Sequence, residues 1–506
     1  SRPLKGRRQA LLFCPLLALL LYLPTLGHDF VFDDRGVIEA NPLMRDIRDL
    51  PRLLVTPYWN APQHSRTLYR PLTSLSFALD RAVSGMRPAW FHAVNAVLHA
   101  IATLLVTLLA LELMPGRAAG AAAAGALFAV HPVHVEAVAG IVGRSEILAA
   151  IGVMAAILCH RRALEAAAGR AGPWTAAAWT ASLCGMLAKE SAIVVPAIGL
   201  LVEAVMPETR GAPRRRRVVL YAGYAAAAAL YLGARAAVLG GLGLGRPIPF
   251  VDNPAPSAGP LGGRRTGLGT LARYARLLVW PQPLSADYSF DQIPVIHSLF
   301  DPLAIAGLLI LIAVVGGGAW LLRLSPVCGF ALLFMAASAA LTTNVVLFIG
   351  TLMAERLMYL PSVGLCVIAG WAVDRAGRPH ARRLAIGSAA LAVLLLAGRS
   401  WARIPDWKDD FALYSSAARV SPRCARIRYN LGNGYLKAAR YGDAEENYRA
   451  ALRIYPEFQD ARVNLGMVLL QERRPQEALA LLESAARQDP GNADIAVNLG
   501  TAYRAL

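Results

Sequence analysis

The sequence predicts an all-α protein in which a polytopic bundle of about eleven membrane-spanning helices precedes an α-solenoid. The first observation is composition: 56% of the 506 residues are hydrophobic and 17% are charged, which is too apolar for an ordinary soluble domain. The second is that apolar runs near the ~20 residues needed to cross a bilayer recur along the chain. The third is a 34-residue repeat near the C-terminus, which is typical of a helical solenoid.

The membrane part is predicted to occupy residues 1–400. Several of its apolar runs are short and rich in Ala, so their bounds are loose by about four residues. The predicted spans are 10–27, 92–114, 118–134, 138–159, 174–188, 190–206, 218–239, 302–322, 326–350, 357–374 and 383–400. The first run follows a basic start, as in a signal peptide, but it lacks a small-x-small cleavage site. We therefore expect a retained anchor.

The net charge of +18 raises the question of nucleic-acid binding. The basic residues gather instead in alternate loops, such as 1–9, 160–173, 207–217 and 375–382. Cationic loops stay on the cytoplasmic side, so the N-terminus is expected in the cytoplasm and the C-terminus on the opposite side. No nucleic-acid motif or aromatic interleaving accompanies the charge. The expected location is the bacterial inner membrane for a prokaryotic source, or the endoplasmic reticulum membrane for a eukaryotic one.

The C-terminal part is predicted to form tetratricopeptide repeats at 425–458, 459–492 and a truncated 493–506. Leu-Gly pairs recur at 34-residue spacing, where small residues let two helices cross closely, and a Pro ends each second helix. Residues 401–424 are interpreted as a linker and a degenerate first repeat helix. Because the chain starts with Ser and stops inside a repeat, we expect it to be a fragment of a longer protein.

Two long loops, 28–91 and 240–301, face the same side as the repeats in this topology. Loops of this length usually carry function or are disordered, and their many Tyr and Trp residues favour function. Within the second loop, residues 270–284 are predicted to form a helix lying on or dipping into the membrane interface, with "LVWP" as an anchor.

Ionisable residues collect on this side of the membrane. Ionisable groups at membrane depth are costly, so they usually pair, line a cavity or act on a substrate. Each one alone is explained as an interfacial charge, but their joint position indicates a site. They are Asp33, Asp34, His131, His134, Glu136, Arg144, Glu146, Lys189, Glu190, Glu355 and Arg356.

The residue types favour chemistry on a lipid-linked phosphate. Arg144, Lys189 and Arg356 are predicted to hold the phosphate, since Arg binds it with a bidentate fork and Lys as a point charge. A carboxylate beside them can accept a proton from an attacking hydroxyl. Neighbours in extended backbone point in opposite directions, so one of Asp33 and Asp34 is expected to face the reacting atoms while the other anchors the loop.

The motifs "FVFDD", "YRPL", "FHAVNAVLH", "HPVHVEAV", "GRSEIL", "WPQPLSADYS" and "AERLMYLPS", followed by the repeats, resemble the TMTC-type (transmembrane and tetratricopeptide-repeat containing) protein O-mannosyltransferases of the GT-C class. The resemblance covers nearly the whole chain. It implies a GT-C-like bundle and an inverting transfer of mannose from polyprenyl or dolichyl phosphate to Ser or Thr of a protein, without a metal or other cofactor.

By analogy with related mannosyltransferases, the resemblance assigns the general base to the first acidic residue of the pair, Asp33. Supporting roles are expected for His131, His134, Glu136, Glu146, Glu190, Glu355, Tyr69 and Arg70. The repeats are expected to present the acceptor protein, with oligomerisation or partner docking left open. The high content of Ala and Arg indicates a prokaryotic protein, so the family's cadherin acceptors are not expected here.

Other functions fit parts of the pattern. His131 and His134 on one helix face, with Glu136 nearby, allow a zinc site, and the two adjacent aspartates allow a metal pair. The six cysteines form no C-x-x-C motif and are expected to be buried small hydrophobes. A non-catalytic, membrane-anchored scaffold is the main alternative to an enzyme. Eleven spans exceed what a tether needs, and the charges gather at one face rather than at mid-membrane as in transporters, so we favour glycosyl transfer.

Overall fold

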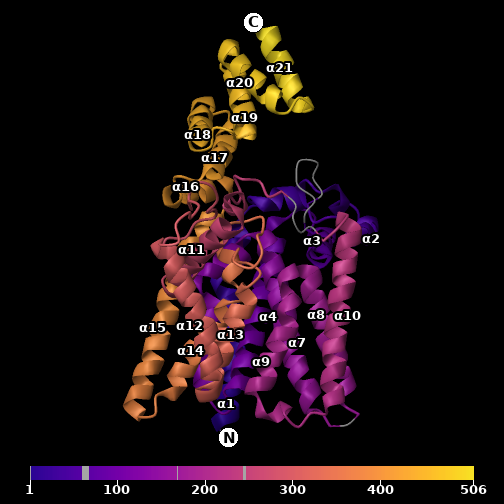
Figure 1. Cartoon of the computed structure of the whole chain (residues 1–506), viewed down its shortest axis with the longest axis vertical. Coiled ribbons are helices and arrows are strands. Elements are labelled where there is room, and N and C mark those ends of the chain that lie inside the picture. The colour runs from indigo at the N-terminus through magenta and orange to yellow at the C-terminus, as the bar shows by residue number, and fades with distance from the viewer. Residues whose placement is uncertain (1, 60–67, 168, 243–246) are drawn as a thin grey trace.

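The computed structural model describes residues 2–59, 68–167, 169–242 and 247–506. Within these ranges the regular elements are helices and no strand occurs. A bundle of roughly aligned helices carries a helical solenoid at one end, called the repeat end below, and the N-terminus lies at the other end (Figure 1). This confirms the prediction of an all-α protein with a helical membrane part followed by repeats.

Each of the eleven predicted apolar runs overlaps one bundle helix. Apolar side chains and Ala favour helix in these runs, and Pro opens several of them at the first turn, where its missing N–H costs nothing. The helices are α1 (Arg2–Leu21), α4 (Pro88–Leu113), α5 (Ala118–Val130), α7 (Arg144–Glu165), α8 (Ala171–Ala188), α9 (Val195–Val205), α10 (Arg214–Leu239), α12 (Pro302–Leu324), α13 (Pro326–Ala339), α14 (Ser362–Arg375) and α15 (Pro379–Arg403).

The described residues form six helical segments long and apolar enough to cross a membrane by themselves. A seventh arises if the pair Ala118–Val130 and Pro132–Ala139, bent by 47°, counts as one span. The six are Lys5–Gly27, Pro88–Leu113, Ile141–Glu165, Arg214–Leu239, Pro302–Leu324 and Pro379–Trp407. The chain is thus a multi-pass membrane protein, but the count of eleven spans stays a prediction. The other helices are shorter because they give way to irregular chain at the repeat end.

Small residues explain why Ala-rich runs serve as central helices. In α5, the residues from Gly120 to Val130 are mostly buried. A Cβ at Gly370 of α14 would collide with the carbonyl oxygen of Gly120. Close backbone approach of this kind is typical of helix packing in membranes, where small side chains increase van der Waals contact.

The repeat end is built from short helices and loops. Residues 60–67 of the first predicted loop and 243–246 of the second lie outside the described residues. The short elements are η1 (Leu23–Gly27), η2 (Arg35–Glu39), η3 (Pro42–Met44), η4 (Ile47–Asp49), α2 (Leu50–Leu53), α3 (Pro71–Ser84), η5 (Pro132–His134), α6 (Val135–Ala139), η6 (Ile141–Gly143), η7 (Glu190–Val194), η9 (Ala255–Ala258), η10 (Glu355–Met358) and η11 (Ile404–Trp407). At the other end, η8 (Pro207–Thr209) lies before α10.

The predicted interfacial helix at 270–284 begins earlier than expected. It is α11 (Gly259–Val279), and one of its faces is buried, with Thr266, Thr270 and Tyr274 among the buried residues. The Gly-rich start was interpreted as loop because Gly disfavours helix. Tertiary packing overrides that preference, since a Cβ at Gly307 of α12 would collide with the backbone of Leu268 in α11.

The solenoid consists of α16 (Asp410–Val420), α17 (Ala425–Lys437), α18 (Tyr441–Ile454), α19 (Gln459–Gln471), α20 (Pro475–Gln488) and α21 (Ala493–Ala505). The glycines of the first two Leu-Gly pairs lie where two helices cross. Gly432 of α17 contacts the Tyr448 ring of α18, and Gly466 of α19 contacts Leu482 of α20. These crossings follow the small-residue pattern read from the sequence.

The first repeat is attached to the second loop by backbone and ionic contacts. The N–H of Ala425 donates to the carbonyl of Phe290 (2.8 Å). Arg426 of α17 forms ion pairs with Asp287 (2.5 Å) and Asp252 (2.6 Å). Because Asp287 is buried, the solenoid is anchored to the bundle rather than hinged freely on a linker.

Candidate active site

The acidic pair after α1 is divided between a buried and an open carboxylate. Asp34 is 1% exposed, and its two oxygens accept the N–H groups of Val31 (3.0 Å) and Val142 (2.8 Å). Burial raises the pKa of Asp34 to about 7, and the neighbouring Asp33 adds to this rise. Asp34 therefore ties the first loop to η6 and has little access to a substrate.

Asp33 lies on the accessible side of the same turn. Its side chain is 26% exposed, and its Oδ2 is 3.9 Å from Nη2 of Arg356. The extended backbone expected to divide the pair is wrong: Phe32 has a left-handed φ of 53°, and Asp34 is helical with φ −58° and ψ −37°. Successive residues of a helical turn lie about 100° apart, and this separation directs the two carboxylates to different sides.

Arg356 is held in place by a buried carboxylate on another element. Glu136 of α6 accepts the backbone N–H of Arg356 (2.9 Å) with one oxygen and its Nη1 (2.7 Å) with the other. Glu136 is 2% exposed, whereas the Arg356 side chain is 25% exposed. The remaining Nη2 is therefore directed toward Asp33, so that an acid and a cation share one opening.

Arg70 is a second cation in this region. It binds Glu190 through a bidentate pair, Nε to Oε2 (3.0 Å) and Nη2 to Oε1 (2.6 Å), and its guanidinium lies over the ring of Tyr58 (5.4 Å). Tyr58 is also within electrostatic reach of Asp33, Asp34 and Arg356. Tyr58 therefore lies between Arg70, which it contacts, and the region of the aspartate pair and Arg356.

Tyr69 connects this cluster to the bundle. Its hydroxyl donates to the carbonyl of Leu54 (2.7 Å), and its ring stacks on that of Tyr231 in α10 at 6.2 Å. The Tyr231 hydroxyl donates to the Tyr69 carbonyl (3.4 Å). The "YRPL" motif thus places Arg70 near the part of α10 that lies toward the repeat end.

Lys189 and Glu146 lie deeper. The Lys189 ammonium donates to Glu146 in a short ion pair, and both side chains are nearly buried, at 6% and 7% exposure. Arg70 and Glu190 lie within electrostatic reach of Lys189. The Lys189–Glu146 ion pair is thus the buried part of the charged cluster.

Arg144 is not open to this region. Its side chain is fully buried, and each of its three nitrogens has a partner. The partners are Asp80 (2.5 Å), Asn95 (2.7 Å), Ser76 (3.2 Å) and the Phe91 carbonyl (3.0 Å). Arg144 was expected to hold a lipid phosphate, but its nitrogens are enclosed by protein partners. Its geometry fits a role in positioning α7, α3 and α4 relative to one another.

The two histidines do not share a helix face, contrary to the expectation. His131 caps η5 and its Nε2 contacts the Leu278 carbonyl (2.9 Å), while His134 Nε2 contacts the Ser362 hydroxyl (2.8 Å). Pro132 ends α5 before the motif begins, because the residue preceding Pro avoids helical conformation. Because Glu136 binds Arg356, the three side chains of this motif each have a different hydrogen-bond partner. In the described part of the chain, no three His, Cys, Asp or Glu side chains form a group suited to a metal ion.

Glu355 supports the loop that follows α11. Its Oε1 accepts the N–H of Ser285 (2.6 Å) and the hydroxyl of Tyr288 (2.6 Å). Burial raises its pKa to about 7. The motifs "AERLMYLPS" and "WPQPLSADYS" are therefore joined by this carboxylate, and Glu355 orders the loop to which the repeats attach.

A polar pocket of about 90 Å³ separates the acidic loop from the first repeat. Asp410 of α16 accepts the Phe32 N–H (2.9 Å) and pairs with Arg35 (2.5 Å), so the linker region reaches the turn that carries Asp33. The lining residues are Phe32, Arg35, Asp410, Tyr414, Asn430, Asn433, Gly434 and Lys437. Sequence reasoning missed Asp410 and Arg35; the second acidic pair, in "WKDDFALY", was the available signal.

Two segments match known families. Residues 250–315 match the family described as "Protein O-mannosyl-transferase TMTC, DUF1736", and residues 429–493 match the tetratricopeptide repeat. Tmtc1 of Drosophila melanogaster is 30% identical over 530 residues, which cover 85% of this chain and 60% of that protein. F38B6.6 of Caenorhabditis elegans is 30% identical over 462 residues, with 88% and 63% covered.

The chain is a relative of the TMTC proteins. The resemblance read from the motifs is confirmed. TMTC2 of Mus musculus is 27% identical over 516 residues, covering 85% of this chain and 60% of that protein. This TMTC relative thus spans about three fifths of the length of these curated proteins.

One solved structure also aligns with the TMTC relative. ArnT from Cupriavidus metallidurans bound to undecaprenyl phosphate covers 97% of this chain and 83% of that one, with a TM-score of 0.41 and 16% identity.

Proposed function

We propose that this TMTC relative is a membrane glycosyltransferase. It moves a sugar, expected to be mannose, from a polyprenyl or dolichyl phosphate to Ser or Thr hydroxyls of proteins. The observation that carries the proposal is the open carboxylate of Asp33 beside Arg356, with Arg70 and Lys189 nearby, at the end of the bundle where the repeats attach. The names of the curated relatives, each a protein O-mannosyl-transferase, support the same class of reaction.

Asp33 acts as the general base in this proposal. The acceptor Oγ attacks the anomeric carbon from the face opposite the phosphate, and its proton passes to the Asp33 carboxylate. The bond from the anomeric carbon to the phosphate oxygen breaks, and its electron pair leaves with the polyprenyl phosphate. The sugar carbon is inverted. Asp34 is unsuited to this role because backbone N–H groups occupy both of its oxygens.

The cations stabilise the negative charge that grows on the departing phosphate. Arg356 is the best placed, since Glu136 fixes one side of its guanidinium while its Nη2 remains on the open side. Arg70 and Lys189 contribute from the side of α8, each compensated by a carboxylate when no donor is bound. Arg144 positions the surrounding helices and does not touch the donor.

The acceptor protein arrives along the repeats. A concave solenoid offers an extended surface for a peptide, and the polar pocket between Phe32 and α17 connects that surface to the turn carrying Asp33. In the proposed orientation the N-terminus is cytoplasmic and the repeats are extracytoplasmic. In intact cells, an impermeant thiol reagent is then expected to label a cysteine introduced at Glu457 and not one introduced at Gly211.

The test is transfer of radiolabelled mannose from polyprenyl phosphate to Ser/Thr-bearing extracytoplasmic proteins by the purified protein. Wild type is compared with Asp33→Asn and Asp34→Asn, each checked for its melting temperature. Loss of a general base typically costs about 10²–10⁴-fold in rate, so we expect that loss in Asp33→Asn with folding retained. Activity that persists in Asp33→Asn would refute the assignment of the base.

Two further arms separate the alternatives. Transfer that continues in EDTA supports a metal-free reaction, whereas loss in EDTA with rescue by a divalent ion would favour the metal-pair alternative. Transfer from another polyprenyl-phosphate sugar but not from the mannose donor would correct only the sugar. No transfer from any donor, combined with capture of proteins by the repeats, would favour the scaffold.

A further inference from the structure

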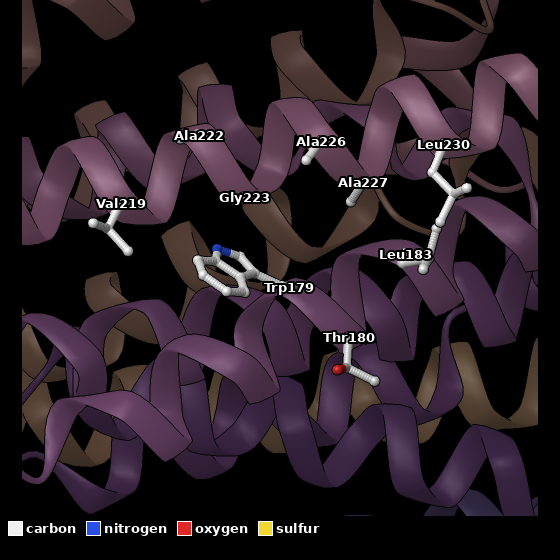
Figure 2. Close-up of a pocket in the computed structure, with 9 residues that line it drawn as sticks. All are labelled: Trp179, Thr180, Leu183, Val219, Ala222, Gly223, Ala226, Ala227 and Leu230. Atoms are coloured by element: carbon white, nitrogen blue, oxygen red, sulfur yellow. The ribbon is translucent and has the colours of Figure 1, made fainter.

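A cleft of about 550 Å³ lies between α8 and α10, away from the aspartate pair (Figure 2). Its lining residues are Trp179, Thr180, Leu183, Val219, Ala222, Gly223, Ala226, Ala227 and Leu230. Among them, Thr180 contributes a hydroxyl, and the indole N–H of Trp179 donates to the Leu220 carbonyl (3.0 Å). The walls are otherwise hydrocarbon, so the cleft suits an apolar occupant.

Small residues on α10 create the space. Ala222, Gly223, Ala226 and Ala227 turn toward α8, and Trp179 lies against Gly223, where a Cβ would collide with the indole. At the other end of the cleft, Leu183 meets Leu230 (Figure 2). Only 22% of the most apolar window of α10 is buried, so this helix borders the cleft on the side where membrane lipid lies.

One end of the cleft lies near the charged cluster. Leu183 precedes Lys189 by six positions on α8, a distance of about 9 Å at 1.5 Å per residue. On α10, Leu230 is followed by Tyr231, which bonds to the Tyr69 carbonyl and lies within electrostatic reach of Glu190, Arg235 and Arg70. The cleft therefore ends about 9 Å, measured along α8, from the nearest cation of the repeat end.

We propose that the cleft between α8 and α10 holds the isoprenoid chain of the lipid donor, which approaches the cluster from the side of Arg70 and Lys189. The assignment rests on the proposed function, which requires a lipid phosphate there. The phosphate must meet cations at the membrane surface, while the chain must stay in an apolar environment. This cleft suits both conditions, because it is apolar along its length and its last lining residue on α8 lies only six positions before Lys189.

The first experiment compares two donors that differ only in chain length. Ala226→Phe fills the cleft from an exposed position, and Ala225→Phe is the matched control, because Ala225 is exposed on the same helix but does not line the cleft. We expect Ala226→Phe to raise KM about tenfold for a long polyprenyl-phosphate-mannose, a change of about 1.4 kcal/mol. With a citronellyl analogue, too short to reach Ala226, its KM should match that of wild type and of Ala225→Phe.

Equal KM values for the long donor in wild type and Ala226→Phe would overturn the assignment. So would an equal rise for both donors, which would mean that the substitution distorts the charged cluster instead of blocking the chain.

The second experiment does not depend on turnover. A polyprenyl phosphate with a photoreactive group along its chain should label peptides from 174–188 and 214–239, and Ala226→Phe should reduce that labelling. If excess phosphatidylglycerol reduces the labelling as effectively as unlabelled polyprenyl phosphate does, the cleft is a general lipid site and the assignment fails. If wild type transfers no sugar but is labelled specifically here, the chain site stands and the transfer reaction fails.

Discussion

Replacing Arg144 tests whether this residue organises the helices or binds the donor. Arg144→Met keeps most of the side-chain volume but removes the charge. It leaves the Asp80 carboxylate, which is 7% exposed, with the indole N–H of Trp90 (3.2 Å) as its remaining partner. Breaking one side of a buried ion pair costs about 3–5 kcal/mol, and the bonds to Asn95 and Ser76 are lost as well.

The assay is thermal unfolding of the detergent-solubilised protein, followed by intrinsic fluorescence. We expect the midpoint of Arg144→Met to fall by roughly 5 °C or more. The double variant Arg144→Met/Asp80→Asn removes the unpaired charge and should recover much of this loss. A single variant that melts like wild type but no longer binds polyprenyl-phosphate-mannose would refute the reasoning and return Arg144 to the donor site.

The other predictions concern pH, site geometry and repeat docking. Burial raises the pKa of Asp34 to about 7 in the folded protein. The protonated carboxyl therefore stabilises the fold fully below pH ~4, and this stabilisation is lost as the pH rises through about 7. Between pH 5 and 8, the melting temperature should fall less in Asp34→Asn than in wild type. Glu136→Gln weakens a charge-assisted contact to Arg356 worth about 1.5–3 kcal/mol, so transfer should drop about 10–100-fold, and the melting temperature should fall by less than in Arg144→Met. Arg426→Met leaves Asp287 buried and unpaired, so limited proteolysis should cut residues 404–424 faster.

Two of these predictions have a matched control variant, and the pH prediction has a refuting outcome. Equal pH slopes in wild type and Asp34→Asn would place the titrating group elsewhere. Glu112→Gln removes a carboxylate that pairs with Arg7 at the opposite end of the bundle, and transfer should be unchanged. Arg440→Met breaks an exposed ion pair with Asp443 and should not alter proteolysis. If Glu136→Gln transfers sugar at the wild-type rate, Arg356 does not need its buried partner.

Several parts of the site were predictable because they depend on local chemistry. The apolar runs overlap the bundle helices because length and hydrophobicity suffice to specify a helix in a membrane. The Leu-Gly spacing identified the repeats because a small residue is required at each helix crossing. Asp33 and Arg356 were both singled out as ionisable residues on one side of the membrane, and the structure brings them within 3.9 Å.

Other features depend on contacts between residues far apart in the chain. The enclosure of Arg144 requires Asp80, Asn95 and the Phe91 carbonyl to converge from two other helices. No local sequence pattern predicts this enclosure. The contact of Asp410 with Phe32 joins residues 378 positions apart.

The sequence by itself determined the class of the molecule: a multi-pass helical protein with tetratricopeptide repeats, related to the TMTC proteins, with charged residues gathered at one end. Hydropathy, charge and repeat spacing are sums over nearby residues, so they can be read along the chain. Only the tertiary structure decided which charges are open and which are enclosed. Asp33 and Asp34 are adjacent and chemically identical, yet the backbone N–H of Val142 occupies one of them and leaves the other facing Arg356.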